Sequence, residues 1–99
     1  MDLKTYKDSL ARDEPPSGLT PALEALWWDA KGDWEKAHER AQEGEDKAAG
    51  AWVHAYLHRK EGDLGNARHW YGQARRPPVE DAPLEAEWEE IVRGLLGPK

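Results

Sequence analysis

The dipeptide Gly-Asp occurs twice in this chain, thirty residues apart, at 32–33 and at 62–63. It lies within two similar segments, KGDWEKA at 31–37 and EGDLGNA at 61–67. Glycine just past a helix end adopts the left-handed conformation that a residue with a Cβ resists. Aspartate at the next position can accept hydrogen bonds from the free amides that start a following helix. Each dipeptide therefore predicts a tight joint between two antiparallel helices.

Apolar residues recur at helical spacing on both sides of each joint. Thr20 and Pro21 provide a capping hydroxyl followed by a proline in the first turn of a helix. Asp46 is placed to cap a helix that we expect from about 47 to 61. For Gly72, inside the last helix of the repeat region, we expect close approach of a neighbouring helix or ring. The stripes that define the other helices are Ala22, Leu23, Leu26, Trp27 and Ala30; Trp34, Ala37, His38 and Ala41; and Leu64, Ala67, Trp70, Tyr71 and Ala74.

Two further amphipathic segments flank the repeat region, and no segment shows the alternation typical of a strand. We therefore predict one all-α domain of about six helices: an N-terminal helix and connector at 1–17, hairpins at 18–46 and 47–78, and a capping helix at 79–99. Two hairpins are fewer than the roughly three repeats a solenoid needs, so the last helix should cover them. The flanking stripes are Leu3, Tyr6, Lys7 and Leu10, and Leu84, Trp88, Ile91, Val92 and Leu95.

Composition excludes several classes of function. The chain has no cysteine, which excludes disulfides, thiolate zinc sites and cysteine nucleophiles. Its net charge of −6 disfavours nucleic acid as a partner. No stretch has the length of a signal peptide or membrane span, so we expect a cytoplasmic protein with no membrane partner. With no catalytic serine motif or phosphate-binding loop, we expect neither an enzyme nor a cofactor.

The apolar content is carried largely by aromatic rings, with six tryptophans, three tyrosines and no phenylalanine. Each such ring can bury roughly 150–250 Å², which favours a folded core over disorder. We expect Trp28 and Trp52 to be the more exposed tryptophans. Those on apolar stripes, which we place in the core, are Trp27, Trp34, Trp70 and Trp88.

The second hairpin resembles a tetratricopeptide repeat. The residues that carry this resemblance are Gly62, Asp63, Leu64, Ala67, Tyr71, Ala74 and Pro77, and the likeness covers roughly 18–78. The thirty-residue period is shorter than the ~34 residues of that repeat, and Pro21 and Ala51 stand at the family's tryptophan position. Residues 52–71 also resemble small uncharacterised bacterial proteins. The resemblance implies a helical superhelix with a groove that binds an extended peptide, and hence a non-catalytic scaffold or adaptor.

By the same resemblance, Trp52, Tyr56, Arg59 and Lys60 would line this groove. Two cations beside two rings would suit a carboxylate or an acidic peptide of a protein partner. An intramolecular alternative is equally open, in which the acidic last helix lies against these residues and neutralises them. The acidic residues of that helix are Glu85, Glu87, Glu89 and Glu90.

A second candidate site is the pair His54 and His58, which share a helix face at i and i+4, with Glu61 continuing the line. Such spacing can chelate a divalent metal through imidazole nitrogens. We favour packed histidines over a metal, with Glu24 of the first hairpin bonded to His54. Metal or small-molecule binding on this face therefore stays the alternative to a peptide-binding function. A structural homodimer through the C-terminal helix is a third possibility.

Overall fold

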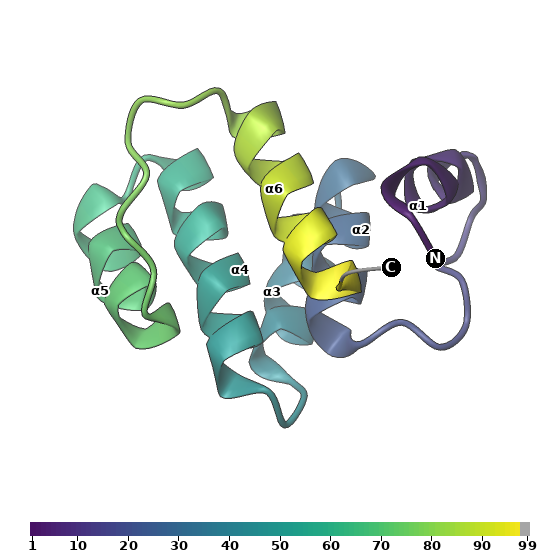
Figure 1. Cartoon of the computed structure of the whole chain (residues 1–99), viewed down its shortest axis with the longest axis horizontal. Coiled ribbons are helices and arrows are strands. Elements are labelled where there is room, and N and C mark those ends of the chain that lie inside the picture. The colour runs from purple at the N-terminus through teal and green to yellow at the C-terminus, as the bar shows by residue number, and fades with distance from the viewer. Residues whose placement is uncertain (98–99) are drawn as a thin grey trace.

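The computed structural model describes residues 1–97, and within this range it contains α-helices, one 3₁₀ turn and no strand (Figure 1). The predicted all-α class with six helices is confirmed. Residues 98 and 99 of the predicted capping unit lie outside the described residues. The helices are α1 (Leu3–Asp8), extended by the 3₁₀ turn Ser9–Ala11, α2 (Pro21–Ala30), α3 (Trp34–Gln42), α4 (Lys47–Glu61), α5 (Leu64–Ala74) and α6 (Leu84–Leu96).

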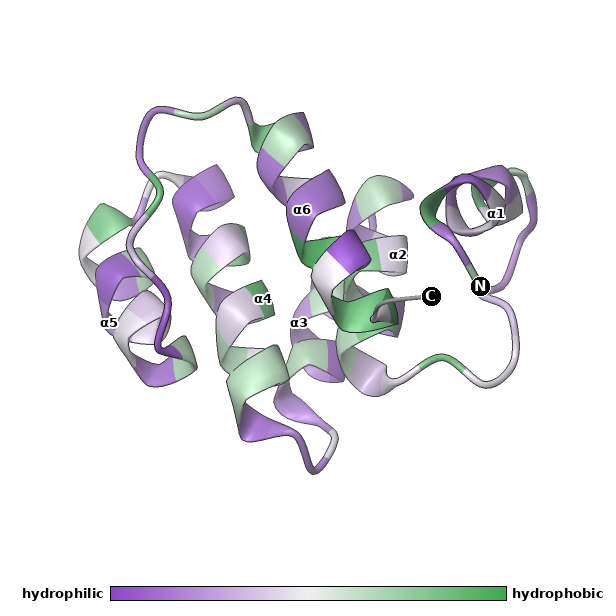
Figure 2. Cartoon of the chain, viewed as in Figure 1, coloured by the Kyte–Doolittle hydropathy of each residue, from purple (hydrophilic) through white to green (hydrophobic). Residues whose placement is uncertain are grey.

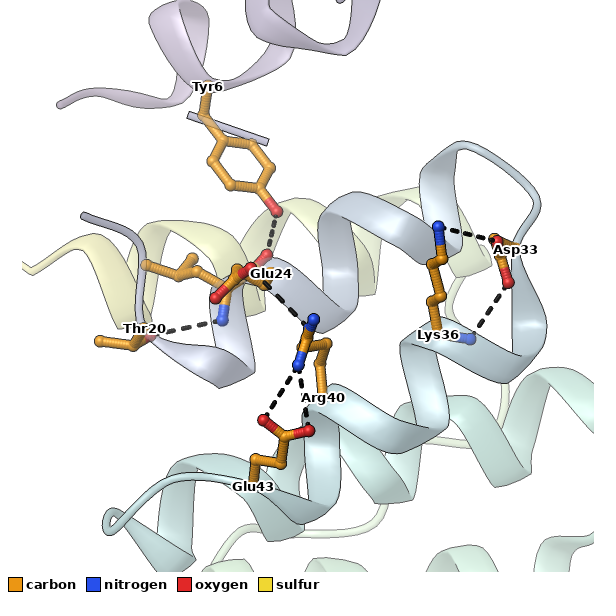
Figure 3. Close-up of polar contacts among 8 residues, drawn as sticks. Tyr6, Thr20, Glu24, Asp33, Lys36, Arg40 and Glu43 are labelled. Atoms are coloured by element: carbon orange, nitrogen blue, oxygen red, sulfur yellow. Dashed lines mark hydrogen bonds and ion pairs between the residues drawn. The ribbon is translucent and has the colours of Figure 1, made fainter. Parts of the chain in front are cut away.

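Both Gly-Asp joints form as the sequence predicts. Gly32 and Gly62 have φ angles of 85° and 89°, in the left-handed region. The Asp33 carboxylate accepts a hydrogen bond from the Lys36 amide at 3.1 Å (Figure 3), and that of Asp63 accepts one from the Asn66 amide at 3.2 Å. Helices α2 and α3 pack side by side, as do α4 and α5 (Figure 1). The two joints are therefore equivalent turns between paired helices.

The starts of α2 and α4 are capped by the predicted side chains. The Thr20 hydroxyl accepts the Leu23 amide hydrogen at 3.4 Å (Figure 3), and the Asp46 carboxylate accepts that of Ala49 at 3.0 Å. The same turn of α2 anchors α1, because the Tyr6 hydroxyl donates to the Leu23 carbonyl at 2.6 Å. Local capping thus sets where these helices begin, and one buried tyrosine attaches the N-terminal helix to them.

All six helices contribute buried residues to the core, α3 through Ala37 and Ala41. Each helix carries both apolar and polar residues (Figure 2). Trp27 and Trp88 are buried as predicted. Two other predictions for tryptophans are wrong. Trp34, predicted to lie in the core, is 36% exposed, and Trp52, predicted to be exposed, is only 6% exposed. Trp52 is buried because α6 crosses it, and that packing is not encoded in α4 itself. The largest fully buried side chains are Trp27, Tyr6, Tyr71, Leu26, Leu57, Ile91, Val53 and Val92.

The expected close contact at Gly72 is also wrong, since no neighbouring atom would lie within 4 Å of a Cβ there. Close approach occurs instead at Gly50 and Gly94. A Cβ on Gly50 would lie 2.8 Å from the Ala41 carbonyl oxygen, and one on Gly94 would lie 2.9 Å from the Trp52 ring. These two glycines let α3 and α6 approach α4 closely.

Helix α6 is fixed to α4 and α5 through the carboxylate of Glu87. The Arg59 guanidinium donates to it at 2.9 Å, and both side chains of this ion pair are buried. The Tyr71 hydroxyl donates to the other carboxylate oxygen. On the next residue of α6, the Trp88 indole donates to the Leu26 carbonyl at 3.1 Å. These contacts make α6 part of the core.

We predict that Glu87→Ala lowers the free energy of unfolding by about 3–5 kcal/mol, because it leaves the buried Arg59 charge without its partner. The measurement is urea denaturation followed by circular dichroism. The control is Glu90→Ala on the same helix, where the side chain is exposed and the expected change is within about 0.5 kcal/mol. Equal effects of the two substitutions would contradict the role of Glu87.

Candidate functional site

Of the four residues predicted to line a peptide groove, three are buried and Lys60 is exposed. Trp52, Tyr56 and Arg59 are only 6%, 3% and 9% exposed. The acidic last helix covers them, and Glu87 neutralises Arg59, which is the intramolecular arrangement that the sequence left open. The Arg76 guanidinium also lies over the Trp52 ring, 3.6 Å from its centroid. An open groove is absent here because the chain fills it with its own helix.

What remains of this side is a cavity of about 360 Å³ between α1, α2, α4 and α6. Tyr56 and Lys60 line it, together with Lys7 of α1 and Trp88 of α6. The Lys60 ammonium donates to the buried Asp29 carboxylate at 2.9 Å. Burial, with a smaller contribution from Asp29, raises the pKa of the Tyr56 hydroxyl, which therefore stays protonated at neutral pH.

The histidine pair on α4 gains a third member, His38, from α3. The ring centroid of His38 lies 5.9 Å from that of His54 and 5.7 Å from that of His58. One possible ligand nitrogen from each of the three rings lies within 4.8 Å of the others. The helix-face pattern of His54 and His58 does not include His38, because His38 precedes His54 by sixteen residues and lies on another helix. Its place on the apolar stripe of α3 was the available signal.

The nitrogens of this three-histidine cluster have unequal environments. The Nδ1 atoms of His38 and His54 are buried, and neither has a hydrogen-bond partner among the described residues. The expected Glu24–His54 bond does not form, because Glu24 instead faces the Arg40 guanidinium at 3.9 Å (Figure 3). Nδ1 of His58 lies 3.2 Å from a carboxylate oxygen of Glu61. Two imidazoles are therefore left without a protein partner while the third is oriented by a carboxylate.

Aromatic rings enclose the three-histidine cluster on two sides. Trp70 of α5 stacks on His54 with 4.5 Å between ring centroids, and Trp34 lies 4.2 Å from His38. Burial lowers the pKa of His54 to about 4, and the nearby His38 and His58 add to this effect. The His54 ring is therefore neutral at pH 7 and keeps a lone pair available for a hydrogen-bond donor or a metal.

None of the helices in the described chain combines the length and apolar character that a bilayer crossing requires. The 13-residue helix α6, for example, carries four glutamates, at positions 85, 87, 89 and 90.

We predict that acid destabilises the metal-free protein partly through His54. The unfolded chain protonates this ring near its ordinary pKa of 6.5, whereas the folded protein does so only near pH 4. Between these values the unfolded state binds more protons, so the free energy of unfolding should fall as the pH is lowered from 6.5 to 4. His54→Asn should flatten this slope in urea denaturation with EDTA present. The comparison variant is His69→Asn, at an exposed histidine outside the cluster.

Comparisons with protein-family models, with curated proteins and with solved structures give no match to this chain. The resemblance to tetratricopeptide repeats therefore stays an interpretation of the repeated motif. Two features of this chain could bind a ligand, the three-histidine cluster and the cavity beside Lys60.

Proposed function

We propose that this protein binds a divalent transition metal, of which Zn²⁺ is the representative, at the three-histidine cluster. The observation that carries the proposal is the pair of buried Nδ1 atoms of His38 and His54, which have no hydrogen-bond partner among residues 1–97. Leaving a buried polar atom unpaired costs about 1–3 kcal/mol, so natural proteins rarely keep two in one place without a use. A metal bound by these nitrogens would satisfy them.

The donor set suits such a metal. Imidazole nitrogen is a preferred ligand of zinc, copper and nickel, and neutral imidazoles are needed for binding. In a tetrahedral zinc site with bonds of 2.0–2.1 Å, ligand nitrogens lie about 3.4 Å apart. In this structure one nitrogen from each of His38, His54 and His58 lies within 4.8 Å of the other two. Side-chain rotations that move these nitrogens by about 1 Å would bring them to the spacing of a zinc site.

Glu61 supports the same proposal. Its carboxylate lies 3.2 Å from Nδ1 of His58, where it can accept the hydrogen of the tautomer whose Nε2 is free to bind a metal. Metal-binding histidines are usually held by such a carboxylate, which fixes the tautomer and makes the other nitrogen more basic. Trp34 and Trp70 flank the cluster, the first in contact with the His38 ring and the second stacked on the His54 ring.

The test is metal analysis and calorimetric titration of protein that carries no histidine tag. Bound Zn²⁺ should stabilise the fold by about 2.7 kcal/mol at a free concentration about a hundred times Kd. His38→Gln should weaken binding more than about a hundredfold, since even the groups that orient a ligand contribute about 10–100-fold. The matched control is His69→Gln, which changes an exposed histidine outside the cluster. Equal affinity in wild type and His38→Gln would refute the proposal.

A second candidate function is recognition of a protein or acidic peptide, as the sequence analysis expected. The cavity beside Lys60 favours it, because this cavity retains Tyr56 and Lys60 and adds Lys7 at its rim. The side chains of Lys7 and Lys60 are 43% and 39% exposed, so both ammonium groups can reach a ligand carboxylate. Lys7 and Lys60 now form ion pairs with Glu89 and Asp29, so each ammonium group would have to contact the ligand and its present partner together.

This second candidate predicts binding of a fluorescein-labelled peptide library rich in Asp and Glu. The double variant Lys7→Gln, Lys60→Gln should weaken binding about tenfold or more, because it removes two charge-assisted hydrogen bonds. Glutamine keeps a donor for Asp29 and so protects the fold. Fluorescence anisotropy is the measurement, and Lys4→Gln is the control because Lys4 is exposed and lies outside the cavity. Binding that is unchanged in the double variant would exclude this surface.

A further inference from the structure

We propose that the metal at the three-histidine cluster keeps one coordination position open and binds a small anion there, such as a carboxylate or azide. This inference rests on the proposed metal-binding function. It assigns the site to the class that holds a metal for an exchangeable ligand, rather than the class in which four protein ligands close the coordination shell.

The number of donors is the first argument. Among residues 1–97, the group around His38 and His54 contains one further metal-ligating side chain, His58. The nearest carboxylate on the same helix, Glu61, belongs to a different group with His58 and Asp63, and it is engaged with Nδ1 of His58. This chain therefore supplies three nitrogens, and a tetrahedral ion needs four ligands.

The second argument is access from solvent. His54 is buried under the stacked Trp70 ring, whereas His38 and His58 are only partly buried. The His58 side chain is 18% exposed, and Trp34 beside His38 is 36% exposed. His54 and Trp70 also line a cavity of about 350 Å³. Solvent and a small ligand can therefore approach a metal held by the three rings, either along this cavity or past the partly exposed His38 and His58.

The third argument concerns charge. The three imidazole ligands are neutral and the one nearby carboxylate, Glu61, contacts only the outer nitrogen of His58, so most of the charge of a divalent ion stays uncompensated. The surrounding tryptophan rings also lower the local dielectric constant. Both effects favour an anion over a neutral ligand at the fourth position.

The experiment uses Co²⁺ as the metal, because its visible absorption bands report both the number and the kind of its ligands. The full-length protein is loaded with cobalt and titrated with sodium azide, and sodium perchlorate serves as a control for ionic strength. We expect cobalt bands of a four-coordinate site that shift saturably with azide and not with perchlorate. His69→Gln, at an exposed histidine outside the cluster, should show the same azide response as the wild type. Glu61→Gln should bind cobalt more weakly, since Glu61 orients His58, but once loaded with excess cobalt it should still respond to azide.

The possible failures are distinguishable. Cobalt bands that azide leaves unchanged would overturn the open position while the metal-binding function stands. An azide response that appears only in Glu61→Gln would also overturn it, because it would make Glu61 the fourth ligand. A metal-dependent dimer in sedimentation, with no azide response, would assign the fourth ligand to a second copy of the chain. The absence of any cobalt bands would remove the proposed function together with this inference.

Discussion

The buried ion pair between Arg59 and Glu87 is the interaction on which the arrangement of this domain depends. It joins the last helix to the second hairpin, with the Tyr71 hydroxyl bonded to the same carboxylate. A buried charge without its partner is strongly destabilising, so this pair favours the one position of α6 that brings Glu87 to Arg59. Other positions of α6 would raise the free energy of the folded state. The aromatic contacts of Trp88 and Trp52 follow from that seating, because each requires α6 at the same position.

This seating also determines where a ligand can bind. By covering Trp52, Tyr56 and Arg59, α6 closes the side of the two hairpins on which a peptide groove was expected. The cavity beside Lys60 stays open there, at the start of α6, and a second cavity lies near the end of α6, beside Ala49 and Leu95. The three-histidine cluster lies elsewhere, where α3 and α5 pack against α4. Its ring contacts involve residues of α3, α4 and α5 and none of α6. Stability and the proposed metal site are therefore built from different contacts of the same central helix.

The predictions that succeeded concern neighbours along the chain. A cap such as Asp33 or Asp63 acts within three residues, and a glycine such as Gly62 acts on its own backbone angles. Predictions about exposure failed where a distant segment decided the outcome. Trp52 is buried by α6, about forty residues later in the chain, and Trp34 stays exposed because no helix in the described part of the chain covers it.

The amino-acid sequence alone determined the helices, their caps and the two joints, since these depend on interactions between residues a few positions apart. It also placed His54 and His58 on one helix face. Only the tertiary structure brought His38 to them and left two of their nitrogens buried without partners. Only the tertiary structure seated Glu87 on Arg59. Such pairings depend on how helices dock, and docking is set by the shape of the whole core rather than by any local pattern.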